Sequence, residues 1–580
     1  MTVNLDQHAR LAEDLVTAYN SADAEAVARL NNLFHSSITA EQIRHFVRDR
    51  LMFLPGYKQH TFDVLTLADA QQLFARLYGF KDWSTFVRSS NEPPPDLHST
   101  PIVLSTTPPF YRIDWTHKSI EPRQPMSNKD WEELFAVVRD FGLTTVNAMN
   151  QISDDDLEKL SQLDHVTSLD LSGSQITDRG LQHLAHMPQL RELRLNHYPG
   201  GGITHRGLEV LQNLRELRVF EICWQSGITD NGISNLSHCD QLEDVNLLGT
   251  QTGNGAIATL TGKPNLRKFR TGRNVTDDGL ALLHDFPAFK TWSGDEVKYG
   301  LMSFGAEPTN LLIDGSITRD GLNNLRGLDG LFGFSFFRHT SGFSGDDLQS
   351  LAVLPNLGFF GCPGEICDDE AMQHISALPK LRMLMAQGTV ATDEGFKRLS
   401  RSASIEYIWG RECPNLKGDG FTALAEMPAL KGLALSCKFV DDDALAKLPA
   451  FPALKELMPM DVTDEGFRHV GRCHGLESLV LMYCRDTTDV ATEHIQALPN
   501  LKKYHGGYTR ITDRSLEILS RMSSLEELSF EGCKAITDAG LAALASLPHL
   551  REISAGNCPN LTREGISAFP ATIRVNYSPL

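Results

Sequence analysis

The sequence contains little that would suit a membrane or a nucleic acid. No run approaches the roughly 18 consecutive apolar residues that a membrane helix needs. Lys and Arg do not cluster, and the 580 residues carry a net charge of −19, whereas binding to phosphates requires clustered basic side chains. We therefore expect no membrane and no nucleic acid among the partners of this chain.

Cysteine is absent before Cys223, and the N-terminal sequence MTVNLDQHARLAEDLV lacks the cationic start and apolar stretch of a secretory signal. We expect a cytoplasmic protein in which the ten cysteines are free thiols. The apolar fraction of 41% predicts folded structure. Because the chain is too long for one compact core, it must form several domains or a repeat array.

Motifs of catalysis and of cofactor binding are also lacking. The segment TLTGKPNL lacks the first glycine and the hydroxyl residue of a phosphate loop. Two groups come nearest to metal-ligand spacing, Cys362 with Cys367 and His469 with Cys473 and His474. Neither group offers the four ligands of a zinc site. We expect no enzyme activity, no metal and no cofactor, although two catalytic side chains on separate loops would leave no motif.

One fragment, ITDxGL, recurs along most of the chain and defines a repeat. Its copies begin at Ile152, Ile176, Ile203, Ile228, Thr252, Val275, Ile317, Phe343, Cys367, Ala391, Leu416, Val440, Val462, Thr487, Ile511, Ile536 and Leu561. Neighbouring copies start 22 to 27 residues apart, except for one step of 42 that marks an insertion, placed at 293–316. A period this regular predicts a solenoid of stacked units.

Each unit combines a helical pattern with a strand pattern. Counted from the start of the fragment, apolar residues recur at +5 and +8, which is helical spacing, and at +17 and +19, which alternate as in a strand. Thr and Asp at +1 and +2, as in Thr177 and Asp178, are expected to cap the helix, and proline at +12, as in Pro188, to end it. Glycine at +4 is unfavourable in a helix, so we expect close packing against the adjacent unit there. Stacking then forms a parallel sheet on the concave side, with the helices outside.

These units resemble the cysteine-containing leucine-rich repeats of F-box/LRR proteins and of bacterial repeat proteins with ITDxGL units. The resemblance extends from Ile152 to the C-terminus. The family's cysteine after the strand is present at Cys413, Cys437, Cys484, Cys533 and Cys558, and most other units replace it. The resemblance implies an α/β leucine-rich-repeat solenoid, and it implies a ubiquitin-ligase substrate receptor as one function. The N-terminal region shows no F-box, which puts that function in doubt.

The remaining residues complete three domains. Residues 126–149 resemble a degenerate first unit, with Ser127 as N-cap, so the solenoid spans 126–580. Residues 89–125 begin with SSNEPPPDLHSTP, which predicts a proline-rich linker and lead-in. Residues 1–88 form a small all-α domain, with helices within 5–34, where Ser21 or Asp23 caps the second, and within 39–54 and 66–87. Residues 75–83 resemble an ARxxGFxxW motif of bacterial proteins, which implies a bacterial source, and we expect Phe80 and Trp83 in the core.

The concave face changes character along the array. When +17 and +19 point inward, +16, +18 and +20 must face the concave side, and in early units these positions are polar, as in Asp170, Glu192 and Arg194. From the seventh unit they are aromatic residues and methionines. We predict a partner-binding patch there, formed by Phe337, Phe359, Met383, Met385, Tyr407, Trp409, Met458, Met460 and Met482. A contiguous apolar patch of this extent usually marks an interface.

The leading functional hypothesis is an interaction scaffold or recognition module that binds another protein or a peptide through this patch. The alternatives are the ubiquitin-ligase substrate receptor and an enzyme with an unrecognised site. The protein itself offers three further occupants of the patch: the N-terminal domain, the insertion, and a second copy of the chain through self-association.

Overall fold

The computed structural model describes residues 5–33, 39–51, 64–77, 82–89, 102–104, 110–122, 126–197, 202–303, 305, 307–570 and 572–578. The chain divides into two units, one of residues 1–137 with 463–580 and the other of residues 138–462. The proline-rich stretch 90–101, the segment 52–63, and Gly79 and Phe80 lie outside the described residues.

The N-terminal residues are helical, as predicted. The helices are α1 (Leu5–Ser21), α2 (Ala24–Leu33), α3 (Ala40–Leu51), α4 (Leu67–Leu77) and α5 (Trp83–Ser89). Of the two predicted caps, Asp23 begins α2, because its carboxylate accepts the N–H of Ala26 at 2.8 Å. A single apolar cluster joins these helices, with Phe86 buried and Trp83 packed against it at a ring distance of 5.0 Å.

Three short strands precede the repeats, in a region that the sequence pattern predicts as linker. They are β1 (Ile102–Leu104), β2 (Tyr111–Asp114) and β3 (Ser119–Pro122). β1 pairs with β2, and β2 with β3, in the antiparallel direction. Ile113 and Ile120 lie opposite each other and are buried, so this part of the lead-in has apolar contacts of its own.

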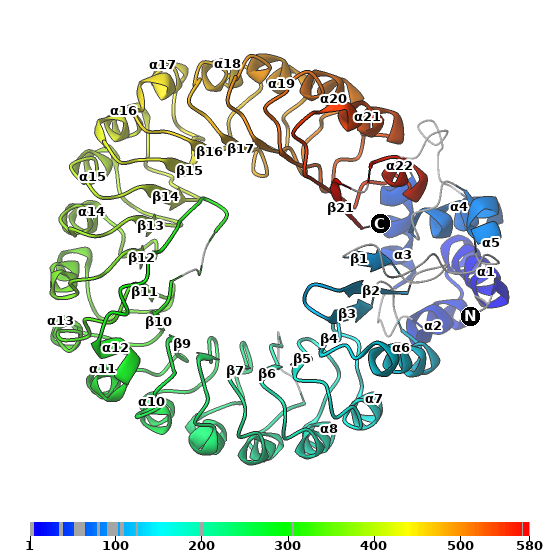
Figure 1. The fold of residues 1–580 in the computed structure, drawn as a ribbon, viewed down its shortest axis with the longest axis horizontal. Helices are drawn as coiled ribbons and strands as arrows, with labels where there is room; N and C mark the ends of the chain where they lie inside the picture. Colours follow the sequence, from blue (N-terminus) through cyan, green and yellow to red (C-terminus); the bar gives the residue numbers. More distant parts are fainter. Residues whose placement is uncertain are drawn as a thin grey trace. The chain divides into compact units, whose positions relative to one another are not determined.

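Residues 138–462 form a curved parallel sheet with its helices on the outer side and its strands on the inner side (Figure 1). Each strand pairs in parallel with the next along the chain. The strands are β4 (Thr145–Asn147), β5 (Ser168–Asp170), β6 (Glu192–Arg194), β7 (Val219–Glu221), β8 (Asp244–Asn246), β9 (Lys268–Arg270), β10 (Asn310–Ile313), β11 (Gly333–Phe336), β12 (Phe359–Gly361), β13 (Met383–Met385), β14 (Tyr407–Gly410), β15 (Gly432–Ser436) and β16 (Glu456–Met460).

The helical segments before and between these strands are mostly short, and several are 3-10 helices. They are α6 (Asn128–Phe141), α7 (Asp154–Leu160), α8 (Asp178–Gln182), η1 (His183–His186), η2 (Gly207–Asn213), α9 (Asp230–Ile233), η3 (Ser234–His238), α10 (Asn254–Leu260), α11 (Asp277–Leu282), η4 (Leu283–Asp285), α12 (Pro287–Lys290), α13 (Arg319–Asn323), η5 (Gly345–Val353), α14 (Asp369–Ser376), α15 (Asp393–Leu399), α16 (Gly418–Ala423), η6 (Leu424–Glu426), α17 (Asp442–Leu445) and η7 (Leu448–Ala450). None of the helices in the described ranges is long and apolar enough to span a membrane.

The C-terminal repeats belong to the other unit and follow the same plan. Their elements are α18 (Phe467–Val470), β17 (Ser478–Val480), α19 (Asp489–Ile495), β18 (Lys503–His505), α20 (Asp513–Leu519), β19 (Glu527–Ser529), α21 (Asp538–Ala543), η8 (Leu544–Ser546), β20 (Glu552–Gly556), α22 (Arg563–Ser567) and β21 (Arg574–Ser578). β17 to β21 pair in parallel in chain order. The predicted repeat fold is therefore confirmed in both units.

The predicted capping needs one correction. The threonine at +1 is the N-cap, as in Thr177, whose hydroxyl accepts the N–H of Arg179. The aspartate at +2 is already the first helical residue, and it bonds to the next unit instead. Asp154 accepts the N–H of Thr177 at 2.8 Å and its hydroxyl at 2.6 Å.

This pairing recurs along both units and forms an Asp–Thr ladder. Its pairs are Asp154 with Thr177, Asp178 with Thr204, Asp277 with Thr318, Asp369 with Thr392, Asp464 with Thr488, Asp489 with Thr512, Asp513 with Thr537 and Asp538 with Thr562. Each pair joins two consecutive units, since its carboxylate satisfies a helix-start amide of the following unit.

The glycine at +4 has the predicted reason. A Cβ on Gly180 would overlap the Asp154 carboxylate of the preceding unit, and a Cβ on Gly540 would overlap that of Asp513. Where serine replaces this glycine, at Ser515, its hydroxyl donates to Asp489 at 2.6 Å. Close packing of the ladder therefore explains why an unfavourable helical residue recurs.

The insertion is shorter than predicted. Residues 310–313, inside the predicted range 293–316, form β10, which pairs with β9 and β11 as any repeat strand does. Among the described residues, 291–303, 305 and 307–309 belong to no helix or strand. The apolar residues of β10 have the pattern of a repeat strand. This strand lies farther behind its helix than in the other units, so counting from the ITDxGL fragment does not predict its position.

Candidate partner-binding face

Strand pairing places the predicted patch residues side by side in two rows. Phe359, Met383 and Tyr407 are register neighbours on β12, β13 and β14. Met385 and Trp409 form the second row, which continues through Ala434 to Met458 on β16. Neighbouring strands lie about 4.8 Å apart, so the side chains of each row are in contact range.

The residues between these rows are buried, as the strand pattern predicts. Leu384 is 0% and Ile408 1% exposed, and Leu457 is also buried. Successive side chains of a strand point to opposite faces of the sheet. The rows therefore lie on the face opposite to these core residues.

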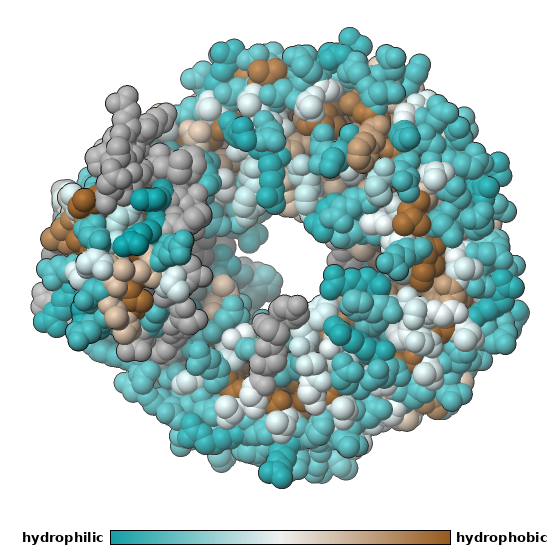
Figure 2. Space-filling view, turned by 180° about the vertical axis from the view of Figure 1, so that it is seen from behind, coloured by the Kyte–Doolittle hydropathy of each residue, from teal (hydrophilic) through white to brown (hydrophobic). Residues whose placement is uncertain are grey.

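The patch is far less exposed than the sequence suggests. Phe359, Met383, Tyr407, Met458 and Met460 are buried. Phe337, Met385, Trp409 and Met482 are half-buried, and Met482 belongs to the C-terminal unit. In Figure 2 the visible surface is mostly hydrophilic, with hydrophobic residues in small separate patches.

A segment of the insertion accounts for part of this burial. Residues 291–303, here called the strap, cross the inner side of the sheet near β10 to β14 (Figure 1). Trp292 stacks on Phe332 at 4.7 Å between ring centroids. Tyr299 lies 6.3 Å from the Phe332 ring and 6.4 Å from that of Tyr407. Of the internal occupants that the sequence left open, the insertion is therefore one that contacts this face.

Polar contacts hold the strap at two main-chain positions. Nη1 of Arg382 donates to the carbonyl of Val297 at 2.7 Å. The N–H of Leu301 donates to Oε2 of Glu456 at 2.9 Å, and the Tyr407 hydroxyl donates to Oε1 of the same carboxylate at 3.2 Å. Val297 and Leu301 are buried, so both ends of this stretch are fixed.

An ion-pair cluster positions Arg382. Its Nη2 lies 2.9 Å from Oε2 of Glu406, which also contacts Nζ of Lys431 at 3.1 Å. Burial raises the pKa of the Glu406 carboxyl, but hydrogen bonds from the two cations outweigh burial and hold that pKa below its usual range. Glu406 therefore stays charged at neutral pH and keeps Arg382 directed toward the strap.

The early strands present a charged surface, as predicted. Arg194 contacts Glu192 at 2.9 Å and Glu221 at 3.5 Å. Arg270 contacts Asp244 at 3.1 Å. These charges are paired within one strand and across neighbouring strands, which stabilises the surface without leaving a run of one sign.

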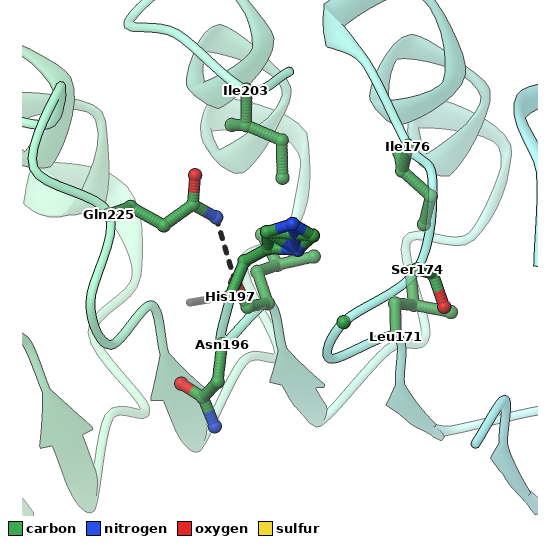
Figure 3. Close-up of a pocket in the computed structure, with 9 residues that line it drawn as sticks. Leu171, Ser174, Ile176, Asn196, His197, Ile203 and Gln225 are labelled. Carbon is green, nitrogen blue, oxygen red and sulfur yellow. Dashed lines mark hydrogen bonds between the residues drawn. The ribbon is translucent and has the colours of Figure 1, made fainter. Parts of the chain in front are cut away.

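A small cavity beside the early strands is too narrow for a ligand. It is lined by Leu171, Gly173, Ser174, Ile176, Leu195, Asn196, His197, Ile203 and Gln225 (Figure 3), and its free volume is about 10 Å³. Gln225 donates to the carbonyl of Leu195 at 2.8 Å at its edge. This volume matches about one water molecule, so the cavity is not a site for a substrate or cofactor.

The cysteines are structural. All ten are buried free thiols, and several donate to main-chain carbonyls, as Cys558 does to Phe530 at 3.0 Å. Burial raises the pKa of Cys239 and Cys533 to about 11. Within the described ranges no group of three or more His, Cys, Asp and Glu is arranged to hold a metal ion.

Comparison with known proteins agrees with this architecture. The model of the Leucine Rich repeat matches residues 163–185 and 521–545. The chain therefore carries leucine-rich repeats and has the leucine-rich-repeat fold. No curated protein matches the leucine-rich-repeat chain.

Three solved structures are similar to this leucine-rich-repeat chain at low identity. A chain of the Rad7 and Elc1 complex from yeast is 13% identical, with 75% of this chain and 90% of that chain covered and a TM-score of 0.31. An internalin from Listeria monocytogenes is 16% identical, with 73% and 93% covered and a TM-score of 0.24. A chain of the TLR13–ssRNA13 complex is 17% identical, with 68% and 50% covered and a TM-score of 0.34.

The repeat pattern did not point to the residues that hold the strap. Arg382, Glu406 and Lys431 stand directly before their strands, one position ahead of the residues that were assigned to the concave face. Many other leucine-rich repeats also have a charged residue at this position, as at Arg191, Arg267 and Lys502, so its presence did not single out these three. The contact of Leu301 with Glu456, 155 residues away, left no signal in the repeat pattern.

Proposed function

We propose that the chain is a recognition module that binds another protein or a peptide on the concave face of its leucine-rich repeats. The observation that carries the proposal is the register of aromatic and methionine side chains on neighbouring strands. Methionine suits surfaces that adapt to a partner, and large aromatic residues dominate the energy of interfaces. The proposed role is binding and not catalysis.

Within the patch, the half-buried residues are the ones a partner reaches first. Met385 and Trp409 are adjacent in register. Phe337 adds a second aromatic site, with Trp224 5.8 Å and His339 5.5 Å from its ring and the Arg338 guanidinium 5.7 Å over it. Phe359, Met383, Tyr407, Met458 and Met460 complete the proposed set within residues 138–462.

A protein or peptide fits this surface better than a nucleic acid does. The net charge of −19 opposes an approach of phosphates. The early strands pair their cations with carboxylates, as Arg194 does with Glu192 and Glu221. We also propose a cytoplasmic location, which the ten buried free thiols support, and a bacterial source stays a prediction of the resemblance.

The test compares capture of partners by the full chain and by Trp409→Ala with Met385→Ala. We expect the double variant to retain less than about a tenth of the captured partner, with a melting temperature close to that of the wild type. The matched control is Phe141→Ala, which alters an exposed aromatic residue on helix α6 and should leave capture unchanged. Equal capture by all three proteins would refute the proposed surface, and loss of capture after nuclease treatment would indicate a nucleic acid.

A further inference from the structure

The strap lies on the concave face in the manner of a bound peptide. Val297, Gly300 and Leu301 are buried and Tyr299 is half-buried, whereas Glu296, Lys298 and Met302 are exposed. A peptide bound along a protein surface likewise buries some side chains and leaves others in solvent.

The residues of the concave face that contact the strap are here called the groove: Phe332, Arg382, Tyr407, Gly432 and Glu456. The groove contacts the main chain of the strap at two points. Arg382 donates to the carbonyl of Val297, and Glu456 accepts the N–H of Leu301. Neither contact involves a side chain of the strap, so a peptide of another sequence can make both. Glu406 holds Arg382, and Tyr407 holds Glu456, which fixes donor and acceptor in place.

Two side-chain sites lie between and beside these points. Tyr299 lies near the rings of Phe332 and Tyr407, with the Arg382 guanidinium 5.4 Å over its own ring. Leu301 and the Tyr407 ring share the space over a glycine, since a Cβ on Gly432 would overlap that ring and come within 3.0 Å of Cγ of Leu301. The groove thus accepts an aromatic side chain and, two residues later, an aliphatic one.

We propose that the strap is an internal occupant of a peptide-binding groove. The external ligand is a peptide segment of another protein, with an aromatic residue followed two positions later by an aliphatic residue, and it displaces the strap. This proposal rests on the proposed function and specifies its partner. The strap lowers the apparent affinity by the fraction of molecules in which the groove is open.

The test uses a fluorescent peptide with the sequence of residues 291–303, TWSGDEVKYGLMS, titrated into the full chain. In the released variant, Tyr299→Ser with Leu301→Ser, the strap loses the two side chains that occupy these sites. The matched control, Glu296→Ser with Lys298→Ser, changes two exposed residues of the same strap. We expect the released variant to bind the peptide at least about tenfold more tightly than the wild type and the control, which corresponds to a groove that is open in about a tenth of wild-type molecules.

Two further proteins keep the test decisive. If the double serine variant does not fold, a wild-type chain with a protease site within the exposed residues 293–296 is cleaved, which frees one end of the strap and keeps every groove residue. Adding Glu456→Ala to the released variant should weaken peptide binding by about fivefold or more, because the acceptor for the peptide N–H is lost. Equal peptide binding by the released, cleaved, control and wild-type proteins would overturn the inference.

The outcome is separable from that of the proposed function. Absence of peptide binding together with capture that depends on Trp409 would overturn the strap inference alone. If the released variant binds the peptide but Trp409→Ala has no effect on capture, the proposed partner surface at Met385 and Trp409 would be wrong. The proposed peptide-binding groove would still stand.

Discussion

The carboxylate of Asp513 binds Thr537 of the next repeat through two hydrogen bonds, one from its N–H and one from its hydroxyl, both at 2.7 Å. Thr537 at the same time caps α21, because its hydroxyl accepts the N–H of Ala539. This pair of residues therefore provides hydrogen-bond acceptors for two amides at the start of one helix, and it also joins two units. The cohesion of the array rests on this pair as well as on the buried leucines.

The first prediction concerns the glycine beside this pair. Replacing glycine by alanine within a helix ordinarily stabilises it by about 1 kcal/mol. In Gly540→Ala the new Cβ overlaps Asp513, and overpacking of this kind costs about 1–3 kcal/mol. We expect a lower melting temperature for Gly540→Ala, measured by circular dichroism, and little change for Gly227→Ala, whose Cβ meets no neighbour. A stabilised Gly540→Ala protein would contradict the role of the ladder.

The second prediction concerns acid. Burial raises the pKa of Asp489, but hydrogen bonds from Ser515 and Thr512 outweigh it and hold this pKa below its usual range. A carboxyl whose pKa is lower in the folded state stabilises the fold above its unfolded pKa of about 4, and that stability is lost as the pH falls through the folded pKa. In Asp489→Asn the melting temperature should fall at neutral pH and approach that of the wild type below about pH 4. A difference that does not depend on pH would show that the charge of Asp489 is not involved.

The third prediction separates two neighbouring aromatic residues of the patch. Tyr407 is 6% exposed and contacts the strap through its ring and through Glu456, so Tyr407→Ala should destabilise the fold by about 3–5 kcal/mol, the range for large buried side chains. Trp409 is half-buried, so Trp409→Ala should lower the melting temperature by no more than a few degrees. Thermal melts of the two single variants test this, and similar losses in both would place Trp409 in the core.

The fourth prediction concerns the thiols. Every cysteine is buried, and burial raises the pKa of Cys223, Cys413 and Cys473 to about 12. The thiolate is the reactive form, so a disulfide-exchange reagent at pH 8 should label fewer than one thiol per native chain. After denaturation it should label all ten. Rapid labelling of a native cysteine would identify a unit that opens locally.

Much of the architecture could be predicted because it depends on local pattern. The helix start at Thr177, the end of the helical segment at His186 shortly before Pro188, and the buried Leu193 each follow from the residue type and its position in the repeat. Repeats contact mainly their neighbours, so a period read from the sequence determines their stacking. The same pattern placed Met385 and Trp409 next to each other on the concave face.

Which segment covers the concave face was decided by the tertiary structure alone. The strand period determines that Tyr407 points away from the helices, but the contact that covers it comes from Tyr299 in a segment without a repeat pattern. The strap reaches Arg382 and Glu456 over 85 and 155 residues of sequence. Contacts at such separations depend on the position of an irregular loop in space. The repeat period of the sequence contains no information on the position of that loop.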